Sequence, residues 1–314
     1  MDVLTDVLET VRVAAVCSGR FEFRAPWGFE LGATPEAMFH AVSEGRCELE
    51  VVGVEERWML EAGDVVALPR GHSHRLRDHR SSEVIPLRPM IGPEPCENGL
   101  VFAAGGSGPK TVILSGQFLF TDAHRHPLLT ALPSVIHLTG QVARATPWFE
   151  MTLGFIASEA ASNRPGARTV IGRLADILFI QIVRGYLGSA PEPTSGWLAA
   201  LAHAQIGSAL ALVHQAPEQP WTVAGLAARV GMSRSAFAAH FTRLVGGPPL
   251  QYVTQWRMSK AASLLRNGRA SLAEVAKNVG YDSETAFSKA FKRSVGHSPG
   301  AYRRALQAGF DGAN

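Results

Sequence analysis

Residues 272–293 have the sequence LAEVAKNVGYDSETAFSKAFKR, and residues 223–243 have the sequence VAGLAARVGMSRSAFAAHFTR. The second copy follows the first at an offset of 49 residues, which becomes 50 after a turn that is one residue longer. A repeat of this length indicates two units of the same supersecondary structure. The matched pairs are Val223 and Leu272, Leu226 and Val275, Ala227 and Ala276, Val230 and Val279, Gly231 and Gly280, Ser233 and Ser283, Phe237 and Phe287, Phe241 and Phe291, Gly246 and Gly296, Pro249 and Pro299, and Tyr252 and Tyr302.

Each copy predicts a short helix, a tight turn and a second helix. Apolar residues at i, i+3, i+4 and i+7 give the first helix one buried face. Gly231 or Gly280 allows the turn a positive φ, and Ser233 or Ser283 is placed to cap the following helix. The paired phenylalanines anchor the second helix on the first, so its opposite face is free to enter a DNA major groove.

The charge of the chain is segregated in a way that supports DNA binding. Residues 201–310 contain 13 Lys and Arg against 4 Asp and Glu, a net charge of +9, whereas residues 1–200 contain 17 against 22, a net charge of −5. A basic domain beside an acidic one is expected where one half neutralises phosphates. An all-helical protein-binding repeat is the alternative, and the basic charge argues against it.

The second copy carries a family pattern. Residues 280–293, with Pro299 and Tyr302 after them, resemble the signature of AraC/XylS-family regulators, and the first copy with Arg257 resembles the family's first helix-turn-helix unit and connecting helix. The resemblance covers about residues 205–305. It implies seven helices, two recognition helices in successive major grooves, and transcriptional activation by contact with RNA polymerase. The sequence itself does not choose between activation and repression.

In that arrangement, base contacts come from the exposed positions of the two recognition helices. Lys289 can donate to guanine and Glu284 can accept from cytosine, although stabilisation of a helix N-terminus is the alternative role for Glu284. Alanines offer only apolar contact, for instance to a thymine methyl group. The predicted base-facing residues are Ser235, Ala238, Ala239, Glu284, Thr285, Ser288 and Lys289.

Phosphate contacts are predicted for basic residues around these helices. Arg234 and Thr242 can assist either with bases or with phosphates. Arg243, Arg257, Lys292, Arg293 and Arg303 are better placed to contact phosphate than to distinguish bases, and solvated surface is the alternative for each.

The rest of the chain divides into a β-rich and a helical part, so the predicted fold class is α+β. Residues 1–146 are expected to form an N-terminal β-barrel, with a proline- and glycine-rich loop at 86–109. Residues 147–196 are expected to form a helical dimerisation segment and linker, and residues 197–310 an all-α DNA-binding domain. The apolar stripe of the Thr169–Tyr186 helix predicts a homodimer, although it could instead cap the barrel.

Two short motifs in the first half resemble those of cupins, the double-stranded β-helix barrels fused to many regulators of this family. The resemblance covers about residues 30–80 and implies a domain that senses a small-molecule effector or a stress signal. The first motif, with Met in place of its first His, consists of Gly32, Met38, His40 and Glu44; the second, with Asp in place of Asn, consists of Gly63, Pro69, Gly71, His74 and Asp78.

These motifs define the predicted effector pocket: Met38, His40, Glu44 and His74. Met38 and His40 lie on the same side of a strand, and His74 is expected on a neighbouring strand. His40, Glu44 and His74 are the predicted ligands of a divalent zinc, iron or manganese ion. A polar pocket without metal is the alternative, and the missing first histidine favours it.

Two other functional classes are weighed against a ligand-sensing regulator. A metal-dependent cupin enzyme is disfavoured by the incomplete ligand set and the fused DNA-binding half, so no catalysis is expected. A cysteine-based redox sensor would use Cys17 or Cys96, for which small apolar packing is favoured, and Cys47 is most simply a core residue.

The expected location is the cytoplasm. The N-terminus lacks the basic start of a signal peptide, and no apolar run of 18 residues indicates a membrane span. Three cysteines without metal spacing suit a reducing compartment. The expected partners are therefore double-stranded DNA, RNA polymerase, a small-molecule effector and a second copy of the chain, with no membrane.

Overall fold

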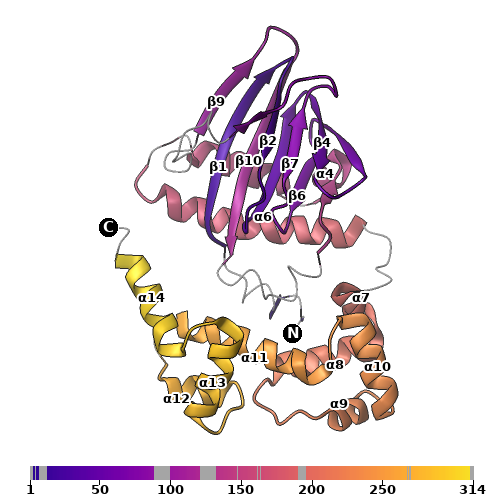
Figure 1. Cartoon of the computed structure of the whole chain (residues 1–314), viewed down its shortest axis with the longest axis vertical. Coiled ribbons are helices and arrows are strands. Elements are labelled where there is room, and N and C mark those ends of the chain that lie inside the picture. The colour runs from indigo at the N-terminus through magenta and orange to yellow at the C-terminus, as the bar shows by residue number, and fades with distance from the viewer. Residues whose placement is uncertain are drawn as a thin grey trace. The chain divides into compact units, whose positions relative to one another are not determined.

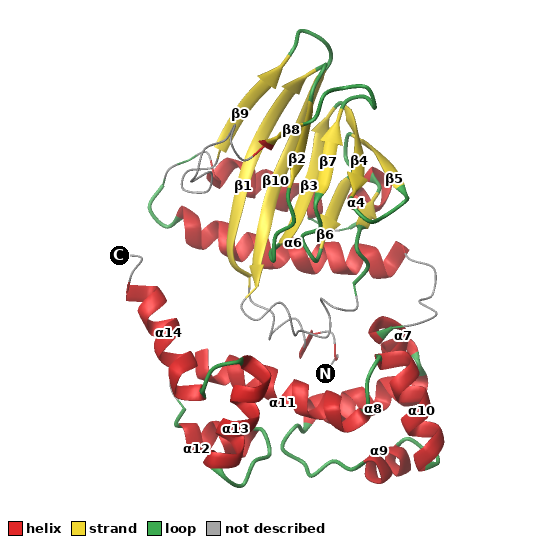
Figure 2. Cartoon of the chain, in the orientation of Figure 1, coloured by secondary structure: helices red, strands yellow, loops and turns green. Residues whose placement is uncertain are grey.

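The computed structural model of the chain forms two compact units, one of residues 11–124 and 132–191 and the other of residues 1–10, 125–131 and 192–314. The strands lie in the first unit, and the second contains the helices from residue 197 onward (Figure 2). No helix of the described residues is long and apolar enough to cross a membrane. The structure describes residues 3, 5–6, 13–87, 100–120, 132–146, 148–160, 162, 164–189, 196–266, 268 and 270–311.

The first unit contains two sheets, as the cupin resemblance implies. The six-stranded sheet has the order β11-β6-β3-β10-β1-β9 and consists of β1 (Val13–Arg24), β3 (Ala37–Glu44), β6 (Val65–Leu68), β9 (Leu100–Gly105), β10 (Lys110–Phe120) and β11 (Ile136–Leu138). The five-stranded sheet has the order β5-β4-β7-β2-β8 and consists of β2 (Gly28–Leu31), β4 (Arg46–Val51), β5 (Arg57–Glu61), β7 (His74–Arg77) and β8 (Ile85–Pro86).

One strand corrects the sequence analysis. Residues 86–109 were expected to form a loop, yet β9 lies within them and pairs in parallel with β1, Gly19 opposite Leu100 and Arg24 opposite Gly105. Most of the glycines and prolines that suggested a loop flank this strand, which contains the strand-favouring Val101 and Phe102. Pairing with β1 at the sheet edge satisfies its backbone groups on one side.

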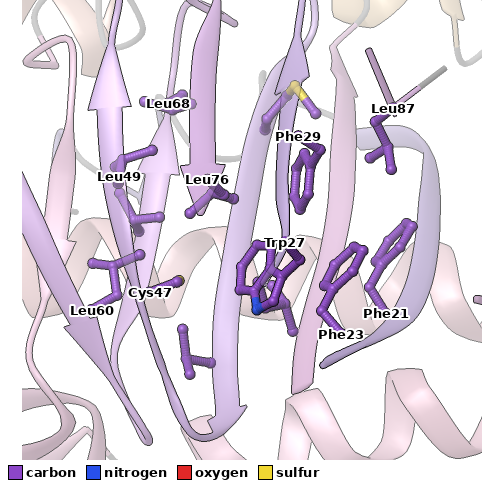
Figure 3. Close-up of a cluster of buried hydrophobic side chains, with 14 of the residues drawn as sticks. Phe21, Phe23, Trp27, Phe29, Cys47, Leu49, Leu60, Leu68, Leu76 and Leu87 are labelled. Carbon is purple, nitrogen blue, oxygen red and sulfur yellow. The ribbon is translucent and has the colours of Figure 1, made fainter. Parts of the chain in front are cut away.

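The hydrophobic core of the first unit lies between the two sheets and is rich in aromatic rings (Figure 3). Phe23 stacks on Trp27 with ring centroids 4.6 Å apart. Leu49, Leu60 and Leu76 of the five-stranded sheet are completely buried. Because side chains alternate along each strand, these residues fill the barrel interior while their neighbours face outward.

Three helices of the first unit, α4 (Gly140–Ala145), α5 (Phe149–Ala160) and α6 (Ala167–Ser189), follow the last strand. Figure 1 shows α6 running across the strands of the six-stranded sheet. Phe179 of α6 meets Phe118 of β10 edge-on at 5.5 Å, and Leu178 and Ile182 are buried. The apolar stripe of α6, from which a dimer was predicted, thus packs against the six-stranded sheet of its own chain. This is the alternative in which the helix caps the barrel.

The second unit consists of a short first helix followed by the seven helices that the family resemblance implies, counted over the residues that the structure describes (Figure 1). These are α7 (Trp197–Ala202), α8 (Ala204–Gln215), α9 (Val223–Arg229), α10 (Arg234–Val245), α11 (Pro249–Arg266), α12 (Leu272–Asn278), α13 (Glu284–Val295) and α14 (Pro299–Asp311).

The two sequence copies fold alike. Phe241 of α10 meets Tyr252 at 5.8 Å and 71°, and their counterparts Phe291 and Tyr302 meet at 5.5 Å and 72°. Edge-on packing of this kind contributes beyond the area it buries. The predicted repeat is therefore a structural repeat, and each copy is a helix-turn-helix unit with its own aromatic core.

Candidate DNA-binding surface and barrel histidine pair

The turns of the two helix-turn-helix units have the geometry that the sequence predicts. Gly231 has φ of 69° and Gly280 has φ of 75°, values that a side chain would disfavour. The Ser233 hydroxyl accepts a hydrogen bond from the backbone N–H of Ala236 at 3.3 Å, and Ser283 caps the other recognition helix in the same way. Each recognition helix thus begins at a fixed point and angle.

The recognition helices α10 and α13 bury one face and expose the other. Phe237 and Phe241 of α10, and Phe287 and Phe291 of α13, are buried. Every predicted DNA-contacting residue of these helices lies off that buried face. Ala238 and Ser288 are half-buried, whereas Arg234, Ser235, Ala239, Thr242, Arg243, Glu284, Thr285, Lys289, Lys292 and Arg293 are exposed.

The cations of this exposed surface have no acidic partner in the part of the chain that the structure describes: no salt bridge there includes Arg234, Arg243, Lys289, Lys292 or Arg293. Unpaired surface cations are available to polyanions without first breaking an ion pair. The surface suits phosphate neutralisation, and which residue contacts a base remains a prediction.

Arg257 of α11 forms contacts that the sequence did not predict. Its Nε donates to the carbonyl oxygen of Pro217 at 2.7 Å, and its Nη2 donates to that of Gln219 at 2.8 Å. The guanidinium also lies 5.8 Å from the ring centroid of Tyr281, and partial burial lowers the pKa of Arg257. These donors hold the α8–α9 loop beside the turn of the second helix-turn-helix unit, a structural role that the sequence did not predict, and the phosphate contact of Arg257 stays a prediction.

Arg303 of α14 is engaged in a similar way. Its Nη2 donates to the carbonyl oxygen of Ala270, just before α12, at 2.6 Å. Basic residues were assigned to phosphate from charge alone, and the sequence contains no signal for these two long-range backbone contacts.

The cupin motifs bring two histidines together in the barrel interior. His40 of β3 and His74 of β7 are completely buried, and their Nε2 atoms are 2.8 Å apart. His40 Nδ1 lies 2.7 Å from the Ser115 hydroxyl, and His74 Nδ1 lies 2.8 Å from the carbonyl oxygen of His72. The sequence predicted that these two histidines share a site, and the structure places them across the two sheets.

One arrangement of the imidazole protons satisfies all three of these hydrogen bonds. The His72 carbonyl can only accept, so His74 Nδ1 donates and His74 Nε2 accepts from His40 Nε2–H. His40 Nδ1 then accepts from the Ser115 hydroxyl. Burial lowers the pKa of His74 to about 4, and burial together with the nearby His74 lowers the pKa of His40. Both rings are therefore neutral at pH 7.

Glu44 does not join the histidines, which corrects the predicted set of three metal ligands. Its carboxylate is exposed at the end of β3 and pairs with Lys110 Nζ at 2.7 Å. The pairing of β3 with β10 shifts register between Val112 and Ile113, so Glu44 does not continue the strand alternation of Met38 and His40. The first cupin motif therefore contributes one ligand candidate instead of two.

The described residues do not fit a metal ion. No group of three His, Cys, Asp or Glu side chains gathers among them. A zinc ion bound by both imidazoles would separate their nitrogens by roughly 3.3 Å, given Zn–N bonds of about 2.0–2.1 Å, whereas the two Nε2 atoms are in direct hydrogen-bond contact. Met38, the fourth predicted pocket residue, packs in the barrel core.

Cys47 is a core residue, as expected. It is completely buried in β4, and burial raises the pKa of its thiol to about 12. A thiol with so little thiolate is a poor nucleophile. The side chain of Cys17 and the whole of Cys96, the two cysteines considered for redox sensing, lie outside the described residues.

Comparisons with known proteins cover both halves of the chain. A family model described as a cupin matches residues 2–188, and one described as a helix-turn-helix domain matches residues 226–305. A Streptomyces lividans protein described as an AraC-like transcription regulator is 37% identical over 305 residues, which is 97% of this chain and 98% of its own.

Two further similarities concern a full-length relative and a solved domain. The HTH-type transcriptional regulator AlkR of Acinetobacter baylyi is 31% identical over 319 residues, covering 97% of this chain and 99% of its own. The crystallised DNA-binding domain of AdpA, a global transcriptional factor in complex with a target DNA, is 36% identical over 34% of this chain and 96% of that chain, with a TM-score of 0.32.

Proposed function

This chain belongs to the AraC-like transcriptional regulators, with a cupin half and a helix-turn-helix half, and we propose that a small-molecule effector bound in the cupin half controls its action on promoters. The regulator binds DNA through its two helix-turn-helix units. The observation that carries the proposal is the pair of matching recognition helices, each with an exposed face of unpaired cations, joined to a domain that holds a ligand-sized cavity.

We assign DNA-sequence specificity more to the second helix-turn-helix unit than to the first. The exposed face of α13 carries Glu284, Thr285 and Lys289, which can form hydrogen bonds with base edges. The corresponding face of α10 carries Ala238 and Ala239, which can only make apolar contacts. We therefore expect α10 to depend more on DNA shape and backbone contacts.

The proposed output is activation by contact with RNA polymerase, which membership of this family supports. The proposed location is the bacterial cytoplasm, where the chromosome lies. We propose that the cupin half does no catalysis. Its histidine pair is completely buried and saturated by internal hydrogen bonds, so neither imidazole faces a space that could admit a substrate. Turnover of a small molecule by the purified chain would overturn this part.

We propose that the chain forms a homodimer through the exposed faces of α5 and α6, and not through the buried apolar stripe of the Thr169–Tyr186 helix. Trp148, Met151 and Phe155, at or next to α5, are 71%, 55% and 57% exposed. Val170 and Ile177 of the adjacent α6 are 45% and 43% exposed. Clustered exposed apolar side chains mark interaction sites. The 23 residues of α6 span roughly 34 Å.

Mapping of chromosomal binding sites, combined with promoter reporters, tests the proposed function. The expected result is enrichment at a small number of promoters whose reporters respond to deletion of the regulator. Uniform recovery of DNA across the chromosome, with no reporter affected, would contradict it. The direction of the reporter change separates activation from repression.

A further inference from the structure

A cavity of about 560 Å³ lies on the outer face of the six-stranded sheet, beneath α4 and α5. It is distinct from the barrel interior, where the predicted effector residues lie and where core side chains fill the space between the sheets (Figure 3). Small-molecule sites have volumes of roughly 300–1,000 Å³. The cavity therefore has the size of a ligand site, in a place that the cupin motifs do not indicate.

The floor of the cavity is one row of cross-strand neighbours. Val65 of β6 pairs with Ala41 of β3, Ala41 pairs with Leu114 of β10, and Leu114 pairs with Arg20 of β1. Neighbouring strands are about 4.8 Å apart, so the row is roughly 14 Å long. It is an apolar strip, with the small side chain of Ala41 near its middle and a basic residue at one end.

The roof is the inward face of α5. Phe149, Leu153, Gly154 and Ala157 line the cavity from this helix. Gly154 is exposed, and a Cβ on it would meet no atom within 4 Å, so the cavity is open on this side. Ile156 is completely buried and holds α5 in place. The space is thus bounded by a supported helix above and a sheet below.

A guanidinium stands at the other end of the strip. Arg144 of α4 lines the cavity, and its Nη1 would lie 3.3 Å from a Cβ on Gly63 and 3.2 Å from one on Gly140. Two glycines thus leave room for this group. In the part of the chain that the structure describes, Arg144 forms no salt bridge.

The Asp64 carboxylate beside the cavity is already engaged in hydrogen bonds. Asp64 accepts from the backbone N–H of Gly140 at 2.7 Å, from that of Glu61 at 3.1 Å and from His137 Nε2 at 3.0 Å. Arg20, at the far end of the strip, pairs with Glu22 at 2.8 Å. Glu150 also lines the cavity and is exposed in the first turn of α5, where the helix dipole favours it. Arg144 is the cation left for a ligand.

We propose that this cavity is the effector site, and that it binds an elongated apolar molecule with one carboxylate, which pairs with Arg144. This assignment rests on the proposed function, since it identifies the site and ligand class through which the regulator is controlled. The same α5 that roofs the cavity exposes Met151 and Phe155 on its other side. Occupancy of the cavity therefore acts on the helix proposed to form the dimer.

Calorimetric titration of the full chain tests the site, with octanoate as the probe below its micelle-forming concentration and 1-octanol as its uncharged analogue. Arg144→Gln removes the charge, and Gly154→Leu fills the space beside the strip. Arg164→Gln removes an exposed arginine from the α5–α6 connection and is the matched control. DNA binding is measured on the same samples.

The expected result is one octanoate per chain, at least tenfold weaker binding in Arg144→Gln, loss of binding in Gly154→Leu, and no change in Arg164→Gln. Octanol should bind at least tenfold more weakly than octanoate. Equal octanoate binding by all variants, equal binding of octanol, or no octanoate binding to the unaltered chain would overturn the assignment. If DNA binding persists in those cases, the effector site fails while the regulatory function stands.

Discussion

The Arg257 guanidinium occupies the space in which a side chain on Gly280 would lie: its Nη2 is 2.7 Å from the position of a Cβ built on that glycine. The same Cβ would be 2.6 Å from the carbonyl oxygen of Glu218. Arg257 belongs to α11, which connects the two helix-turn-helix units, and Gly280 belongs to the turn of the second of these. The α8–α9 loop, the connecting helix and the second turn are therefore packed at one point.

This contact predicts unequal effects at the two matched turn glycines. Gly231→Ala meets no atom within 4 Å, so it should cost only the strain of a positive φ, about 1–2 kcal/mol. Gly280→Ala adds a clash with backbone and should cost at least about 1 kcal/mol more. Urea unfolding of the two full-length variants measures the difference. Equal midpoints for both would show that the Arg257 contact does not constrain the turn.

Much of the second half could be predicted from the sequence because its determinants are local. The turn glycines, the capping serines and the phenylalanine pairs act within one helical hairpin, and the repeat supplied an internal check. The structural role of Arg257 was missed because its acceptors, Pro217 and Gln219, lie about 40 residues away in a loop. Charge alone cannot distinguish a cation that binds phosphate from one that ties backbone together.

The first half was predicted less completely because its determinants depend on register. Motif spacing correctly brought His40 to His74, but it could not reveal the register shift that carries Glu44 out to Lys110. The cavity was missed for the same reason. Its floor joins Val65, Ala41 and Leu114 from three strands, and no spacing within a single segment connects them.

The buried histidine pair predicts loss of stability in acid. The pKa of His74 is lowered to about 4 in the folded chain, whereas an unfolded histidine titrates near 6.5. The unfolded chain therefore binds more protons between these values, so stability is complete above pH 6.5 and falls as the pH falls toward 4. The loss between pH 7.5 and pH 5 should be on the order of 2 kcal/mol.

Urea unfolding at pH 7.5 and pH 5 measures this loss, and His74→Gln provides the comparison. The variant is expected to be less stable at pH 7.5 and to lose less stability on acidification. A pH dependence that is the same in both proteins would contradict the role given to the pair.

The exposed face of α5 predicts a dimer that one charge disrupts. The native chain should have twice its 33.7 kDa mass in solution, and Phe155→Glu should shift it to the single-chain mass, because the glutamate would lose its hydration in an apolar interface. Val52→Glu is the matched control, since Val52 is 54% exposed on a barrel turn. Sedimentation velocity distinguishes the two masses, and a Phe155→Glu protein that stays dimeric would exclude this surface.

The central claim is that the exposed cations of α10 and α13 hold DNA, and the salt dependence of promoter binding tests it most directly. Fluorescence anisotropy with DNA from a promoter identified by site mapping should give affinity that falls steeply with salt. Lys289→Ala should cost about 1–3 kcal/mol, or reduce the salt slope by about 1 if Lys289 contacts phosphate. Arg164→Ala, in the other half, should change neither quantity. Salt-independent binding, or equal effects of the two substitutions, would contradict the account.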